Sequence, residues 1–174
     1  MKKLTLIPCV AGLVIGACTP GADVPGPSLM PDKAETDVAY QDDAGVQRLT
    51  IAGCCAFEAP ADAQIIQNQA MTRDGFRPIR VNLDDDSVTI EPILGSHGYL
   101  EARDGVRSTL DGRDARTLTS SGGSTIIVVP LVRAIDGRTA AMSIRLTGNC
   151  QHGNCDLLDD VVKSFTIEGD WSSA

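Results

Sequence analysis

The cysteines are the residues whose type and spacing could do chemistry. Cys54 and Cys55 are adjacent, and Cys150 and Cys155 enclose His152. Thiolate and imidazole are the soft ligands that Zn²⁺ or Cu⁺ prefers, so Cys150, His152 and Cys155 form one candidate metal or thiol-redox site. Their spacing is not a standard ligand repeat, and an oxidising compartment favours disulfides instead.

If these four cysteines are oxidised they form two disulfides, and three pairings are open. A bond between Cys54 and Cys55 closes a strained eight-membered ring, whereas Cys150 with Cys155 closes an easy loop. We favour cross-links between the two pairs, which would join the first strand to the last helix and stabilise the fold by about 2–4 kcal/mol each. The prediction is therefore structural disulfides with no metal and no cofactor, and the metal or redox site is the alternative.

The remaining candidates for chemistry predict no catalytic residue. His97 and His152 are the only histidines, and neither lies beside a Ser, Cys or Asp in a recognisable nucleophile motif. Arginines between positions 103 and 116 could hold an anion, but interleaved aspartates largely cancel their field. We expect a salt-bridged meander there, formed by Arg103, Arg107, Arg113, Arg116, Asp104, Asp111 and Asp114.

Alternating apolar and polar residues predict the strands that must position these groups. One strand runs from Val46 through the Cys54-Cys55 pair to Phe57 and stops before Pro60. Two hairpins follow, and the unbroken apolar run 126–129 predicts the centre of the sheet. These hairpins are Ile79–Leu83 with Val88–Glu91 around Asp84–Asp86, and Thr125–Val132 with Met142–Thr147 around Asp136-Gly137.

A helix is predicted for Leu157–Ser164, with Asp156 as its N-cap and its apolar side on the sheet. A short strand, Phe165–Glu168, follows it. The segment Ala61–Met71 favours a short helix by its spacing, although a strand through Gln64–Ile66 is also open. The expected fold is α+β, a mostly antiparallel sheet with a C-terminal helix packed on it.

Two short segments of the predicted domain are similar to segments of a known group of domains. They are Asp160–Phe165 and Phe57-Glu58-Ala59-Pro60. Together they resemble the sheet-and-helix domains of the PsbP and Mog1 type. That resemblance implies an α/β/α sandwich used for binding or assembly.

The N-terminus has the parts of an export signal: Lys2 and Lys3, an apolar run from Leu4 to Ile15, and small residues at positions 16 and 17. The run is too short to span a bilayer. The signal ends in Ile15-Gly16-Ala17-Cys18, which resembles the lipobox of bacterial lipoproteins. The resemblance implies cleavage before Cys18 and lipid on its sulfur, and several acyl chains make release from a membrane negligible.

This reading divides the chain into a signal peptide (1–17), a lipidated flexible tether rich in proline and glycine (18–40) and a single domain (41–174). Cleavage removes Lys2 and Lys3 and no acid, which takes the formal charge from −8 to −10. Nucleic acid repels such a domain, so the expected partners are the membrane, through the lipid, and an envelope protein. Thr19, in place of an aspartate after the cysteine, favours the periplasmic face of the outer membrane. The predicted function is non-enzymatic binding or assembly.

Overall fold

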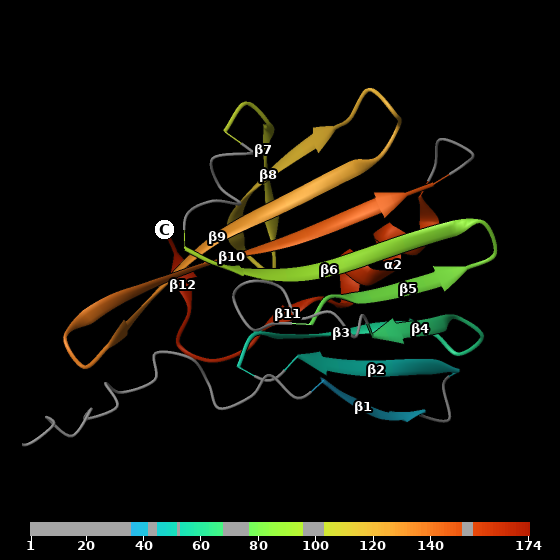
Figure 1. The fold of residues 1–174 in the computed structure, drawn as a ribbon, viewed down its shortest axis with the longest axis horizontal. Helices are drawn as coiled ribbons and strands as arrows, with labels where there is room; N and C mark the ends of the chain where they lie inside the picture. Colours follow the sequence, from blue (N-terminus) through green and yellow to red (C-terminus); the bar gives the residue numbers. More distant parts are fainter. Residues whose placement is uncertain (1–35, 42–44, 52, 68–76, 96–102, 151–154) are drawn as a thin grey trace, which may run out of the picture.

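The structure is a computed structural model that describes residues 36–41, 45–51, 53–67, 77–95, 103–150 and 155–174. Within these ranges the chain forms two antiparallel sheets and one short C-terminal helix (Figure 1). The predicted α+β class, a mostly antiparallel sheet with a C-terminal helix, is therefore confirmed. Strands make up more of the described chain than the sequence predicts.

The larger sheet has eight strands, all paired antiparallel, in the order β4-β5-β6-β10-β9-β8-β7, with β12 also beside β9. The hairpin β9–β10 contains its longest strands, and β10 rather than the apolar run in β9 is the middle one. The bounds are β4 Gln64–Gln67, β5 Ile79–Leu83, β6 Asp86–Leu94, β7 Val106–Leu110, β8 Arg113–Thr119, β9 Thr125–Ile135, β10 Arg138–Asn149 and β12 Ser172–Ser173.

The smaller sheet has four strands in the order β1-β2-β3-β11 and lies along the β4 side of the larger one (Figure 1). Its strand β1 begins at Thr36, before position 41, where the sequence predicts the domain to start. The short strand β11 returns from the C-terminal helix and pairs with β3. The bounds are β1 Thr36–Gln41, β2 Val46–Ile51, β3 Cys55–Pro60 and β11 Thr166–Ile167.

Aspartates occupy the tips of three tight hairpins. Asp84, Asp111 and Asp136 have φ values of 51°, 49° and 48°. Aspartate tolerates this left-handed region better than most residues, and such φ values match the two-residue turns that join twisted antiparallel strands. The predicted turns between β5 and β6, and between β9 and β10, are thereby confirmed.

The core lies between the inner faces of both sheets and helix α2, which spans Asp156–Ser164. Met142, Ile144 and Leu146 of β10 are at most 1% exposed, as their alternation predicts. Ser143, a polar residue between two of them, is buried as well, at 1% exposure. The helix contributes three buried side chains. At its C-terminal end, a phenylalanine ring stacks on a ring of β3, with the ring centroids 6.0 Å apart. These residues are Leu157, Leu158, Val161, Phe57 and Phe165.

Three local predictions are wrong. The favoured helix is wrong: Gln64–Gln67 forms strand β4, the alternative that the sequence leaves open for Gln64–Ile66, because all four residues pair with β5 in a ladder. The expected continuous strand through the Cys54-Cys55 pair is broken by a turn at Gly53, which has φ of 69°. The N-cap of α2 is Cys155, without a side-chain cap. Asp156 instead lies in the first helical turn, where a carboxylate favours the positive helix end.

Candidate functional site

The four cysteines predicted to carry chemistry lie in two separate places. Cys54 bonds to Cys55 at the turn between β2 and β3, and Cys150 bonds to Cys155 between β10 and α2. The cross-links expected between the two pairs are therefore wrong. Each cysteine pairs with its neighbour in sequence, because the turn at Gly53 brings the first two sulfurs together and the start of α2 lies close to the end of β10. Cys18, His97 and His152 lie outside the described residues.

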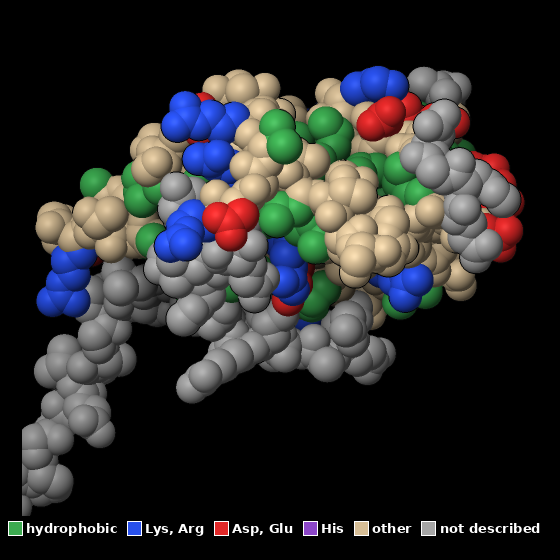
Figure 2. All heavy atoms as spheres, turned by 90° about the horizontal axis from the view of Figure 1, so that it is seen from above, with side chains coloured by type: hydrophobic (Ala, Val, Ile, Leu, Met, Phe, Trp, Pro, Cys, Tyr) green, Lys and Arg blue, Asp and Glu red, His purple; other side chains and the backbone are tan. Residues whose placement is uncertain are grey.

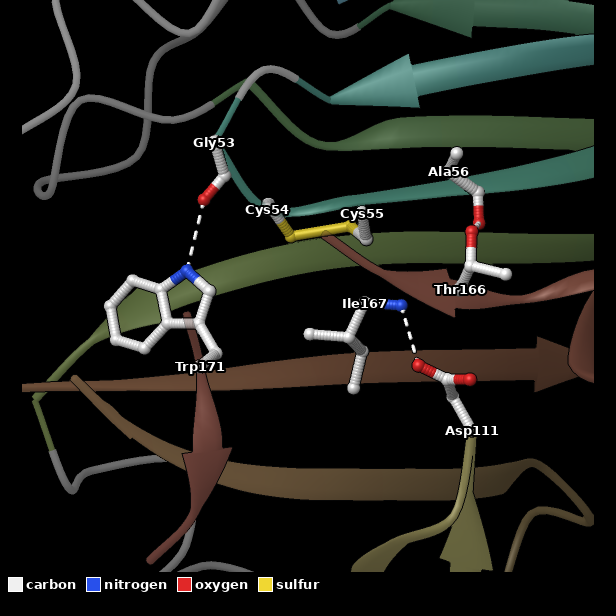
Figure 3. The surroundings of a disulfide bond; sticks show 8 residues. All are labelled: Gly53, Cys54, Cys55, Ala56, Asp111, Thr166, Ile167 and Trp171. Carbon is white, nitrogen blue, oxygen red and sulfur yellow. Dashed lines mark hydrogen bonds between the residues drawn. A yellow bond between two sulfur atoms is a disulfide. The ribbon is translucent and has the colours of Figure 1, made fainter. Parts of the chain in front are cut away.

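The Cys54–Cys55 disulfide is enclosed by protein. Both residues are fully buried, and the Cys54 N–H donates to the carbonyl of Ile51 at 3.0 Å to close the turn. Figure 3 shows the indole of Trp171 beside this turn, with Nε1 donating to the carbonyl of Gly53 at 3.1 Å. The Glu168 N–H donates to the carbonyl of Cys54 at 2.9 Å. These hydrogen bonds connect the disulfide to the C-terminal segment. The buried pair is therefore placed to stabilise the fold, and not to react with a substrate.

The Cys150–Cys155 disulfide is half-buried, and its Cα atoms are 5.3 Å apart. It lies against β10 at Gly148, where a Cβ would come within 3.2 Å of the Cys155 sulfur and 2.8 Å of a Leu158 methyl carbon. Only glycine leaves room for so close an approach of the helix start to the strand. The end of β10 and the start of α2 therefore hold the two cysteines beside each other.

The carboxylate of Asp86 lies close to the Cys150–Cys155 pair. The donor atoms of Asp86, Cys150 and Cys155 lie within 4.8 Å of one another, and all three residues are half-buried. Strand register explains the approach. Ser87 of β6 pairs with Asn149 of the antiparallel strand β10, so Asp86, just before Ser87, lies beside Cys150, just after Asn149. Sequence reasoning assigns the aspartates at 84–86 only to a turn. The missing signal is the pairing of two strands far apart in the chain.

The arginine-rich meander contains salt bridges between neighbouring residues, as the sequence predicts: Arg103 with Asp104 and Arg113 with Asp111. Arg113 pairs with Asp111 and also donates to the carbonyl of Trp171, and Arg116 donates to the carbonyl of Gly105 at 3.2 Å. On the face drawn in Figure 2, basic and acidic side chains lie beside one another. A hollow of about 220 Å³ beside Arg107 and Arg116 is also lined by Asp114. The negative charge of Asp114 beside the two arginines makes this hollow a poor site for an anion.

A second hollow, of about 380 Å³, lies between the smaller sheet and α2. The hydroxyl of Ser164 accepts a hydrogen bond from the Glu58 N–H at 2.9 Å and so joins the helix to β3 at its floor. At its rim, Lys163 pairs with Asp160 at 3.3 Å, and these side chains are 73% and 59% exposed. We call this hollow the β3–α2 groove; its lining residues are Val46, Glu58, Ala59, Pro60, Asp160, Lys163 and Ser164.

Comparison with protein family models, curated proteins and solved structures finds no match to this chain. Among the described residues, no helix is both long enough and apolar enough to cross a membrane.

Proposed function

We propose that this protein is an exported, lipid-anchored protein of the bacterial cell envelope that binds a protein partner without catalysing a reaction. The anchor is supported by the signal at residues 1–17 and the lipobox cysteine, Cys18. The sequence from Thr19 to Pro31 is rich in proline and glycine, which suits a spacer between a membrane and the first strand at Thr36. An outer-membrane location and the α/β/α likeness to PsbP- and Mog1-type domains stay predictions from the sequence.

The β3–α2 groove is the single observation that carries the binding role. Its walls combine the half-buried apolar side chains of Val46 and Pro60 with the charges of Glu58, Asp160 and Lys163. Protein-binding surfaces combine apolar contact with a charged rim in this way, and the rim charges set the partner's orientation. The occupant with the matching chemistry is a polypeptide segment that has apolar residues flanked by charges.

The anchor is tested by Cys18→Ala. We expect the variant to lose its acyl chains and its cleavage before residue 18, and to leave the membrane fraction on cell fractionation. Mass spectrometry of the wild-type N-terminus should find diacylglycerol on the Cys18 sulfur. An unchanged membrane attachment and an unprocessed N-terminus in both proteins would contradict the anchor.

The groove is tested by a photo-crosslinking residue at Lys163 in the exported protein, with the same residue at Arg138 in the β9–β10 turn as control. Both positions are exposed. We expect one discrete adduct from position 163 and none from position 138. Charge reversal of the neighbour, Asp160→Lys, should suppress that adduct at unchanged thermal stability. Equal adducts from both positions would argue against a specific groove.

A further inference from the structure

We propose that reduction of the Cys150–Cys155 disulfide creates a Zn²⁺ site formed by both thiolates and the carboxylate of Asp86. These three donor atoms already lie within 4.8 Å of one another. Donors bound at about 2.0–2.3 Å to a tetrahedral ion are separated by about 3.3–3.8 Å. Opening the sulfur–sulfur bond lets the thiolates move apart to that spacing, which a Cα separation of 5.3 Å accommodates.

The donor set favours zinc over its competitors. Thiolates exclude Mg²⁺ and Ca²⁺, which take oxygen ligands, whereas a carboxylate is a poor ligand for Cu⁺. Zn²⁺ accepts both sulfur and carboxylate oxygen, and three protein ligands leave its fourth position to water. The +2 charge of the ion also offsets most of the repulsion among the two thiolates and the carboxylate.

The scaffold holds the ligands before the metal arrives. Asp86 opens β6 next to the end of β10, because Ser87 pairs with Asn149. Cys155 is fixed at the start of α2, pressed against β10 at Gly148. The Cys54–Cys55 disulfide offers no equivalent: among the described residues, no histidine, aspartate or glutamate joins its sulfurs in a three-ligand cluster.

Redox state controls this site through a balanced exchange. A dithiol reductant gives two electrons and two protons to the Cys150–Cys155 bond, which becomes two thiols while the reductant becomes a disulfide. Zn²⁺ then displaces the two thiol protons and binds the thiolates. A disulfide oxidant takes two electrons from the two thiolates and is itself reduced to two thiols, which re-forms the Cys150–Cys155 bond, removes both sulfur ligands and releases the ion. The site thus alternates between a structural disulfide and a metal centre.

The experiment titrates purified full-length protein with Co²⁺, a spectroscopic substitute for Zn²⁺, before and after reduction by a dithiol. We expect the reduced protein to bind one equivalent with thiolate-to-cobalt absorption, which Zn²⁺ removes, and the oxidised protein to give no such signal. Cys150→Ser should abolish the signal. Asp86→Asn should weaken binding by at least about tenfold, whereas Asp85→Asn, at the exposed neighbouring turn position, should bind as wild type.

Folding is checked on the oxidised proteins, in which wild type and Asp86→Asn should share one circular dichroism spectrum. Three results would overturn the site: no thiolate signal in reduced wild type, an unchanged affinity in Asp86→Asn, or a signal that persists in Cys150→Ser and disappears in Cys54→Ser. The titration uses neither a membrane nor a partner. Its failure therefore leaves the anchor and the groove untouched, and their failure leaves the zinc site untouched.

Discussion

The carboxylate of Asp111 accepts a hydrogen bond from the backbone N–H of Ile167 at 2.8 Å (Figure 3). This bond connects the tip of the β7–β8 hairpin in the larger sheet to β11 in the smaller sheet, 56 residues away in sequence. Asp111 also pairs with Arg113, which donates in turn to the carbonyl of Trp171. One turn residue therefore holds the edge strand, the β11 segment and the C-terminal segment together.

Asp111→Ala should destabilise the domain by about 1–3 kcal/mol, because it leaves the partly buried Ile167 N–H without its acceptor. Alanine also tolerates the φ of 49° at this position less well. Asp111→Asn keeps an acceptor oxygen and a residue that adopts positive φ, so it should retain most of the stability. Urea unfolding followed by far-ultraviolet circular dichroism measures both. Equal losses in the two variants would mean that the charge, and not the hydrogen bond, is what matters.

Trp171→Phe should cost about 0.5–1.5 kcal/mol of unfolding free energy, because the carbonyl of Gly53 loses the part-buried hydrogen bond that the indole N–H donates to it. Trp171→Ala should cost about 3–5 kcal/mol, since a side chain only 6% exposed is removed from the core. Trp171 is the only tryptophan, so circular dichroism must follow the unfolding of both variants. A Trp171→Phe variant as stable as wild type would show that this hydrogen bond contributes nothing.

Gly148→Ala should destabilise by about 1–3 kcal/mol, since the new methyl group would lie 2.8 Å from a Leu158 carbon and 3.2 Å from the Cys155 sulfur. Gly122→Ala is the matched control, because its methyl group would meet only the Ser120 hydroxyl, at 3.7 Å. Thermal unfolding should show a lower midpoint for the first variant and a nearly unchanged one for the second. Equal midpoints would mean that α2 moves away from β10 at little cost.

Graded reduction of the native protein should open Cys150–Cys155 before Cys54–Cys55. Cys150 and Cys155 are half-buried. Cys54 and Cys55 are fully buried, in the turn that the hydrogen bond from the Cys54 N–H to the Ile51 carbonyl closes. A thiol must reach a sulfur atom to exchange with it, so access orders the two reactions. Alkylation and peptide mass spectrometry at increasing dithiothreitol should label positions 150 and 155 first. Simultaneous labelling of all four cysteines would mean that reduction follows global unfolding.

Sequence predicts the local hairpins of this fold well, because each depends on neighbouring residues. Alternation around the turns at Asp84 and Asp136 fixes both strands and their inward side chains. The turn at Gly53 escapes prediction because the apolar residues around it continue the pattern of a buried strand. Strand β4 escapes because its isoleucines suit a helix or a strand equally, and pairing with β5 decides between them.

The candidate zinc site is predicted only in part. Cys150 and Cys155 are evident from their spacing and residue type. Asp86 is not, because it reaches them through the pairing of β6 with β10, in which Ser87 lies opposite Asn149. No local pattern encodes which two strands of an eight-stranded sheet become neighbours. The β3–α2 groove is missed for the same reason, as its walls come from residues 46–60 and 160–164.

The two disulfides span only one and five residue steps of the chain. Closing a loop of about six residues removes about 2 kcal/mol of unfolded-chain entropy, against nearly 5 for a loop of about 100 residues. The Cys150–Cys155 bond can therefore form while the rest of the chain is still unfolded. Neither disulfide of the described residues joins strands that are far apart in the chain, so noncovalent contacts set the order of those strands.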